Sequence, residues 1–426
     1  MSLFVIVSFL VLAFLGMPLA FSLGVSAIAG LWMAGFDLLV LPPRLMNSVN
    51  SFPLMSIPLF MIAGELMLKG GIMDRLVDLA NAFIGRVRGG LAQVTIIAGA
   101  GLASVSGAAV ADASALSSTL VPSLRKQYSL GFSTGVVAAA ANLGPIIPPS
   151  GAMIVYAFMA GSSVSVGGLF MSGVVPGLIV FFSFMGLCWF ISWKRDYPLV
   201  GEPVTIARIV REVRRSFLVF LMPVLVIGGI VIGAFTPTEG AAIGVCYALF
   251  LGFFVTKNLS LSDLPDVLLT AAKTSALVGA MIAFASTVTF LFTIDMLPLK
   301  LASLLQGVTE SPFVFLCLVA AMLLVVGMFL ESNAAYIMLV PLFHPIALQY
   351  GIDPLHFGFL FVLNLVIGML TPPVGVVLFV VTGITGVKMG ELVRESWPFI
   401  AAMYAVLLLC MLVPGVVTWL PERLGY

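Results

Sequence analysis

The sequence contains Gly144-Pro145-Ile146-Ile147-Pro148-Pro149-Ser150-Gly151 in its first half and Gly368-Met369-Leu370-Thr371-Pro372-Pro373-Val374-Gly375 in its second, at an offset of 224 residues. An Asn-Leu pair closely precedes each stretch, at Asn142 and Asn364. The tripeptide Leu-Val-Pro also occurs twice, at 120–122 and 339–341. Single matches arise by chance where Pro and Gly are abundant, but three landmarks in the same order indicate an internal repeat.

The composition indicates the environment of this repeat. Of 426 residues, 61% are apolar and 9% are charged, whereas a soluble domain carries about a quarter charged residues. The apolar runs are continuous rather than alternating, which excludes a β-barrel. A net charge of +1, with 19 Lys and Arg scattered along the chain, excludes nucleic-acid binding. The sequence therefore predicts an all-α polytopic membrane protein with room for about ten transmembrane helices.

Apolar runs and the residues that interrupt them predict the order of elements. The run up to residue 36 has no basic flank and no convincing cleavage site, so it is interpreted as two spans broken at Pro18 and not as a signal peptide. Two runs are interrupted near their middle and are interpreted as re-entrant helical hairpins, at about 89–124 and 312–349. Spans are expected near 2–17, 19–36, 51–69, 129–160, 166–193, 216–234, 240–256, 274–294, 355–384 and 396–420.

These elements predict an inverted-topology repeat. If both hairpins enter and return, each half has five crossings, and an odd number inverts the second half. The expected domains are residues 1–197 for the first repeat, 198–215 for a cytoplasmic linker and 216–426 for the second repeat. With both termini outside the cytoplasm, 16 of the 19 basic residues fall on the cytoplasmic side, all except Arg44, Lys300 and Arg423, as the positive-inside rule requires.

Four interruptions are the expected location of a binding site: the hairpin tips at 104–107 and 327–332 and the two Pro-Pro segments. Matched interruptions in an inverted repeat indicate a transporter site. Because no Lys, Arg or His is predicted at the midplane, half-helix N-termini and bound cations are the available positive charges for an anion. Carbonyls freed by proline, with the hydroxyls of Ser104, Ser106 and Thr371, suit a hard cation such as Na⁺. The alternative is a proline kink packed by small residues.

Four acids lie within apolar runs or at their interruptions, where an ionisable residue is a functional hypothesis by default. Asp112 and Glu331 follow the two tips and are related by the repeat. Each could contact substrate, a cation or a proton, or stabilise the opposite interruption through a hydrogen bond. Glu239, in Thr-Pro-Thr-Glu-Gly, is interpreted as the start of a helix. No role follows for Glu65.

Other polar features of the chain receive structural interpretations. His344 and His356 are interpreted as interfacial residues, because no acid lies in helical register with them. The stretches 73–88 and 297–308 are expected to be amphipathic arms at the membrane interface. No metalloprotease or paired Gly-x-Gly-Asp motif occurs, and no Gly-x-Ser-x-Gly motif has a usable intramembrane histidine, so an enzyme is not expected.

Several segments that span nearly the whole chain occur together in one order: Phe52 to Phe60 with Ala63-Gly64-Glu65, Ser104 to Gly107, Gly144 to Pro149, Phe235 to Glu239 and Thr371 to Gly375. In this order they resemble the large membrane subunit of tripartite ATP-independent periplasmic (TRAP) transporters, within the wider ion-transporter superfamily. The resemblance implies an elevator-type secondary transporter that uses Na⁺ to import an organic acid across the bacterial inner membrane, with both termini in the periplasm. A soluble periplasmic binding protein would deliver the acid, and a small four-helix membrane subunit, expected as a separate polypeptide, would brace the scaffold.

The resemblance also implies site residues. One Na⁺ site would lie between the first tip and the first Pro-Pro segment, formed by Ser104, Ser106, Gly144, Ile147 and Pro149. Its repeat-related mate would be formed by Gly327, Gly368, Thr371 and Pro373. The substrate would lie between the tips, near Asp112, Ser332 and Asn333.

Asp112 also bears on the expected substrate. Dicarboxylate-type members of the family are expected to have a small polar stretch without an acid at this place. A negative charge near the site disfavours a dianion, which favours sialic acid or another sugar acid over a C4-dicarboxylate. The alternative is a self-sufficient organic anion carrier of the same superfamily, coupled to Na⁺ or H⁺ and working without a binding protein.

Overall fold

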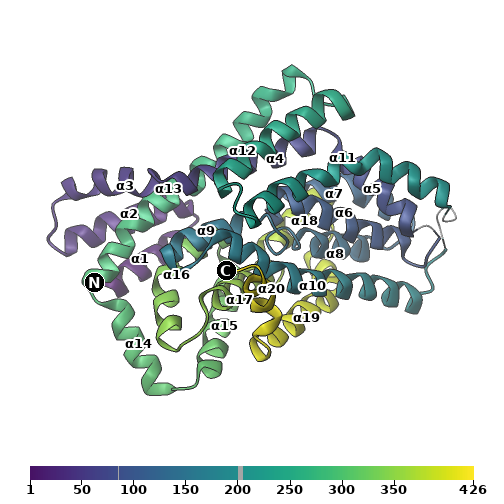
Figure 1. Cartoon of the computed structure of the whole chain (residues 1–426). Helices are drawn as coiled ribbons and strands as arrows, with labels where there is room; N and C mark the ends of the chain where they lie inside the picture. The colour runs from purple at the N-terminus through teal and green to yellow at the C-terminus, as the bar shows by residue number, and fades with distance from the viewer. Residues whose placement is uncertain (85, 200–204) are drawn as a thin grey trace.

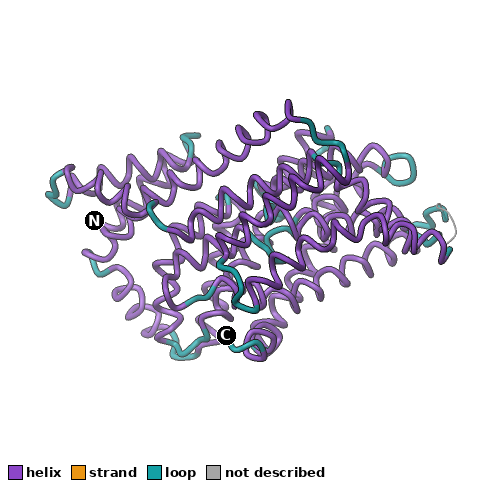
Figure 2. Tube along the Cα trace, turned by 45° about the horizontal axis from the view of Figure 1, so that its top comes forward, coloured by secondary structure: helices purple, strands orange, loops and turns teal. Residues whose placement is uncertain are grey.

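The computed structural model describes residues 1–84, 86–199 and 205–426, and these residues form helices and loops without a strand (Figure 2). Proline, glycine and short polar caps end the helices where the sequence predicts interruptions. The first repeat contains α1 (Ser2–Phe14), α2 (Leu19–Met33), α3 (Leu41–Val49), α4 (Ser56–Lys69), α5 (Ile72–Ile84), α6 (Gly90–Ser106), α7 (Ala109–Leu124), α8 (Leu130–Ala141), α9 (Gly151–Ala160) and α10 (Val166–Lys194). The break between α1 and α2 at Pro18 is confirmed.

The second half repeats this order of elements. It contains α11 (Ile206–Val231), α12 (Pro237–Phe250), α13 (Leu264–Ile294), α14 (Leu297–Val308), α15 (Pro312–Phe329), α16 (Ser332–Gln349), α17 (Pro354–Met369), α18 (Val376–Thr385), α19 (Met389–Leu412) and α20 (Gly415–Arg423). Apart from the short helix α3 in the first half and α20 at the end of the second, both halves consist of three apolar helices followed by a short arm, a helical hairpin, a broken helix and a long helix. The two hairpins, α6–α7 and α15–α16, and the two broken helices, α8–α9 and α17–α18, are therefore confirmed as elements.

Seven helical stretches of the described residues are long and apolar enough to cross a membrane. The helices α1 and α2 and both halves of each broken helix are shorter than these seven. About ten crossings, and the orientation of the termini, therefore stay predictions.

The polar segment 198–215 is partly helical, because α11 begins at Ile206. Within α11, the carboxylate of Glu212 pairs with Arg211 at 3.0 Å and with Arg215 at 3.6 Å. The pair of Glu212 with Arg215, three residues further on, has the spacing that supports the first turns of α11. Residues 200–204 of the expected linker lie outside the described residues.

The helices pack as two groups that run side by side (Figure 1). The span bundle consists of α1–α4 and α11–α13, in which α13 packs against α2, α3 and α4, and α4 packs against α12. The hairpin bundle consists of α6–α10 and α15–α20. Within it α7 packs against both α8 and α18, and α16 against both α17 and α9. Each hairpin therefore contacts a broken helix of both repeats, which brings the four interruptions into one region.

Candidate functional site

The tip of the first hairpin packs directly against the first Pro-Pro segment. Gly107 ends α6 with φ of +59°, a left-handed conformation that favours glycine. A Cβ atom on Gly107 would lie 2.8 Å from both the amide nitrogen of Gly151 and the carbonyl oxygen of Pro149. Only glycine therefore allows this approach of the two backbones, and it places Pro149 beside the hairpin tip.

Asp112 lies in the first turn of α7 and is fully buried. Its Oδ1 atom accepts a hydrogen bond from the hydroxyl of Ser106, and its Oδ2 atom has no hydrogen-bond partner among the residues that the structure describes. A Cβ atom on Gly144 would lie 2.5 Å from Oδ2. The carboxylate of Asp112 therefore points at the first broken helix, next to two residues of the expected first cation site.

The remaining residues of the expected first site belong to the same two elements. The hydroxyl of Ser104 donates to the carbonyl of Gly101 in its own helix at 2.7 Å, which leaves oxygen lone pairs for a further partner. Ile147 lies in the loop between α8 and α9. The peptide bond between Pro148 and Pro149 is cis, as is that between Pro372 and Pro373.

The second hairpin contacts the second broken helix at two glycines. A Cβ atom on Gly368 would lie 2.6 Å from the Cα atom of Gly327, so the two backbones touch without intervening side chains. Gly375 donates a backbone hydrogen bond of 3.0 Å to the carbonyl of Met328. The hydroxyl of Thr371 donates to the carbonyl of Ile367 at 2.7 Å. Pro373 lies in the same loop, so the structure brings the four residues of the expected second cation site to one hairpin and one broken helix.

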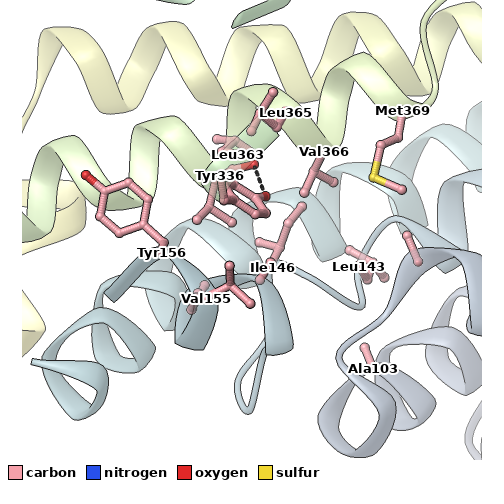
Figure 3. Close-up of a cluster of buried hydrophobic side chains, with 14 of the residues drawn as sticks. Ala103, Leu143, Ile146, Val155, Tyr156, Tyr336, Leu363, Leu365, Val366 and Met369 are labelled. Atoms are coloured by element: carbon pink, nitrogen blue, oxygen red, sulfur yellow. Dashed lines mark hydrogen bonds between the residues drawn. The ribbon is translucent and has the colours of Figure 1, made fainter. Parts of the chain in front are cut away.

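A buried asparagine joins the two broken helices to each other. The side-chain amide of Asn142 donates to the carbonyl of Val366 in α17 at 2.9 Å, across the two repeats. The related Asn364 donates to the carbonyl of Ala320 in α15 at 2.9 Å. In the sequence both asparagines served only as landmarks of the internal repeat. Their position just before each interruption was the available signal that their side chains link neighbouring helices. Figure 3 shows the apolar interface around this link, where Leu143 and Ile146 face Val366.

A cavity of about 360 Å³ lies between the two hairpin tips and against the span bundle. Its walls come from the tips, from the start of α9, and from α4 and α13. Of the three residues predicted to lie near the substrate, Ser332 and Asn333 line this cavity, whereas Asp112 does not. Among the described residues no Lys, Arg or His lines the cavity, and its two acids are Glu65 and Glu331.

Asp112 and Glu331 are related by the repeat but have different surroundings. Glu331 is the N-cap of α16: its side chain accepts from the amide of Ala334 at 3.4 Å and from the side chain of Asn333 at 2.8 Å. It therefore stabilises its own helix, not the opposite interruption. Glu239 forms a capping box with Thr236 at the start of α12, which confirms its interpretation as a helix start.

The two histidines, which the sequence analysis placed at the interface, are both buried inside the protein. His344 and His356 have exposed fractions of 2% and 3%. Their hydrogen-bond partners come from tertiary packing, and their depth in the membrane stays a prediction.

Three helix N-termini border the cavity. Gly107 to Ala111 form the start of α7, Gly151 and Ala152 the start of α9, and Ser332 and Asn333 the start of α16. Free amide groups and the helix dipole give each N-terminus a partial positive charge, which suits a carboxylate or another anion. The site therefore combines a cavity bordered by three helix N-termini with two flanking clusters of oxygen atoms.

The comparisons with known proteins agree with this architecture. The family described as "Tripartite ATP-independent periplasmic transporter, DctM component" matches residues 6–416. The YdaH transporter of Alcanivorax borkumensis has a similar structure, with a TM-score of 0.59 over 88% of this chain and 87% of that chain, at 15% identity. At this identity the likeness shows the fold alone.

Curated relatives cover nearly the whole chain. It is 36% identical over 383 residues to the C4-dicarboxylate TRAP transporter large permease protein of Pseudomonas aeruginosa, covering 90% of this chain and 89% of the relative. It is 35% identical over 418 residues to the sialic acid TRAP transporter large permease protein of Vibrio cholerae, covering 97% of both. It is 34% identical over 409 residues to the 2,3-diketo-L-gulonate TRAP transporter large permease protein of Escherichia coli, covering 95% of both. The chain therefore belongs to the DctM family, the large membrane permeases of tripartite ATP-independent periplasmic transporters.

Proposed function

We propose that this permease imports an organic acid across the bacterial inner membrane by coupling its entry to Na⁺. It works with a small four-helix membrane subunit and with a soluble periplasmic binding protein that delivers the acid. The observation that carries the proposal is the cavity: three helix N-termini border it and no basic side chain among the described residues lines it. An anion there is held by partial charges alone, so co-bound cations supply the remaining positive charge.

The first proposed Na⁺ site is supported by the unpaired oxygen of Asp112. A fully buried carboxylate oxygen without a partner is costly, and a cation beside it would offset that cost. Hydroxyl groups and backbone carbonyls complete an oxygen-only set of ligands, which a hard cation prefers. The ligands are those of the first tip and the first broken helix, namely Ser104, Ser106, Gly144, Ile147 and Pro149, with Asp112 now added to them.

The second proposed Na⁺ site uses Gly327, Gly368, Thr371 and Pro373. It is supported by the direct backbone contact between Gly327 and Gly368, because closely spaced carbonyls beside an interrupted helix carry partial negative charge. Both sites lie where a hairpin meets a broken helix, so Na⁺ binding would tighten the hairpins around an occupied cavity. Such a closed hairpin bundle would then move against the span bundle as an elevator.

For the substrate we propose a sugar acid, such as sialic acid, in preference to a C4-dicarboxylate. The initial reason was the charge of Asp112, but that side chain does not line the cavity. Glu65 and Glu331 do line it, and two carboxylates disfavour a dianion more than a monoanion. Ser332 and Asn333 supply hydrogen bonds to hydroxyl groups. The relatives are named for sialic acid, diketogulonate and C4-dicarboxylates, so the choice rests on the cavity.

The test is uptake into proteoliposomes that contain both membrane subunits, with the binding protein outside. A panel of labelled sialic acid, other sugar acids and C4-dicarboxylates is offered with and without an inward Na⁺ gradient. The proposal requires uptake that depends on the gradient and is greatest for a sugar acid. Uptake that persists unchanged without Na⁺ would refute the coupling. Ser106→Phe and Thr371→Phe, placed in the two proposed Na⁺ sites, should abolish uptake while the subunits still assemble.

A further inference from the structure

One imidazole joins the second hairpin to the first repeat. His344 lies in α16, and its ring has hydrogen-bond partners at both nitrogens. Nδ1 lies 2.9 Å from the hydroxyl of Tyr156 in α9, and Nε2 lies 2.8 Å from the hydroxyl of Ser163. Ser163 ends the short 3-10 helix Gly161–Ser163 that follows α9. The side chain therefore connects residues that are 188 and 181 positions away in the sequence.

One tautomer of the neutral ring fits the hydrogen bonds around it. Ser163 donates its hydroxyl hydrogen to the carbonyl of Ala160 at 3.0 Å, so its oxygen accepts from Nε2–H of His344. Nδ1 then accepts from the hydroxyl of Tyr156, which has an exposed fraction of 0%. A neutral imidazole with its hydrogen on Nε2 satisfies every one of these groups.

Aromatic packing holds the same ring in place. The rings of Tyr156 and His344 meet edge to face with centroids 5.9 Å apart, and Phe361 lies 5.5 Å from Tyr156. In Figure 3 the hydroxyl of Tyr156 points away from the other labelled side chains, so its partner comes from outside that apolar cluster. Burial of a tyrosine hydroxyl is favourable only with such a partner.

His344 contacts the first repeat from a part of α16 in which prolines interrupt the backbone hydrogen bonds of the helix. Pro341 and Pro345 both lie inside α16, and each removes one backbone hydrogen bond from the helix. The attachment is twelve residues after Ser332, roughly 18 Å along a helix. A contact at this point therefore sets the direction of the half-helix whose N-terminus lines the cavity.

On the other side of the contact, the partner in α9 is adjacent in sequence to a residue that lines the cavity. Tyr156 follows Val155, which lines the cavity together with Gly151 and Ala152 at the start of α9. We propose that His344 is a positioning residue that fixes α16 against α9 and so sets the spacing of two of the three helix N-termini around the substrate. The role in substrate binding rests on the proposed function of the cavity, whereas the attachment itself does not.

Two measurements test this role separately. The first is the distance between spin labels on the exposed positions Ser162 and Gln349, introduced as cysteines after the four native cysteines have been replaced. The reconstituted complex should give one narrow distance distribution, and His344→Phe should broaden or lengthen it. The matched control is His356→Phe, which removes the other histidine of the chain, bonded to the carbonyl of Cys410 in α19. An unchanged distribution in His344→Phe would overturn the proposal.

The second measurement is the kinetics of Na⁺-driven uptake per amount of assembled complex. We expect His344→Phe to raise the KM for the acid by about tenfold, because two hydrogen bonds of ordinary strength are lost and part of their free energy distinguishes the bound form. The maximal rate should stay within about twofold.

Tyr156→Phe, which folds with a smaller perturbation, should raise KM less. The double variant should match His344→Phe, since the partner of Tyr156 is already gone. A KM equal to that of the wild type, or additive effects of the two substitutions, would overturn the positioning role. If the wild type shows no Na⁺-driven uptake, the proposed function fails, and the label distances alone decide whether His344 attaches α16.

Discussion

Gly368→Ala is the sharpest test of the contact between the second hairpin and the second broken helix. A Cβ atom at this position would lie 2.6 Å from Cα and 2.7 Å from the carbonyl carbon of Gly327. Carbon atoms in ordinary contact are about 3.5–4.0 Å apart. Both neighbours are backbone atoms that cannot rotate away, so α15 and α17 must separate by roughly 1 Å, at a cost of about 1–3 kcal/mol typical of overpacking.

The cost should appear mainly in Na⁺ binding. The hairpin and the broken helix are also joined by the hydrogen bond from Gly375 to Met328, and the proposed second cation site lies between them. If binding requires the close approach, the free energy of separation opposes it. A cost of about 1–3 kcal/mol then raises the half-saturating Na⁺ concentration by about fivefold to somewhat over a hundredfold.

The assay is uptake of the acid as a function of external Na⁺, in proteoliposomes with matched amounts of assembled complex. Gly383→Ala is the matched control, because it lies in α18 of the same broken helix and its Cβ would meet open space. It should leave the Na⁺ dependence unchanged. A Gly368→Ala variant with normal uptake and normal Na⁺ dependence would refute the steric reasoning and the placement of the second site.

Three further predictions concern other parts of the molecule. Asp112→Asn should raise the half-saturating Na⁺ concentration with little change in the KM for the acid. In the same uptake assay Asn333→Ala should raise the KM for the acid with little change in the half-saturating Na⁺ concentration. Identical effects of the two substitutions would contradict the separation of the Na⁺ site from the substrate site. Glu239→Ala removes the side-chain acceptor of the capping box of α12 and should lower the melting temperature with unchanged uptake per folded complex. Lys300, 2.7 Å away, and the backbone amide of Ser2 hold the pKa of Asp295 well below its usual range by hydrogen bonding. Its stabilisation is therefore complete above the pKa of an unfolded aspartate, about 3.9, and is lost as the pH falls through the folded-state pKa. Asp295→Asn should lower the melting temperature at pH 7, and the difference from the wild type should narrow below about pH 4.

The sequence predicted the elements that depend on neighbouring residues. Proline removes a backbone donor and glycine permits left-handed turns, so the interruptions at 144–151 and 368–375 and the tip at Gly107 follow from local chemistry. Apolar runs of sufficient length predict membrane helices for the same reason. The repeat was visible because both halves carry these local signals in the same order.

The tertiary structure alone decided which of these elements meet, and with which side chains. Asp112 and Glu331 occupy related positions, yet one points at a broken helix and the other caps its own helix beside the cavity. The partners of His344 and Asn142 come from the other repeat, 181 to 224 residues away. No local pattern encodes such contacts, because they arise when the two hairpins each pack against broken helices of both repeats. The sequence by itself therefore determined where the chain is interrupted, and the packing of the two repeats decided what those interruptions enclose.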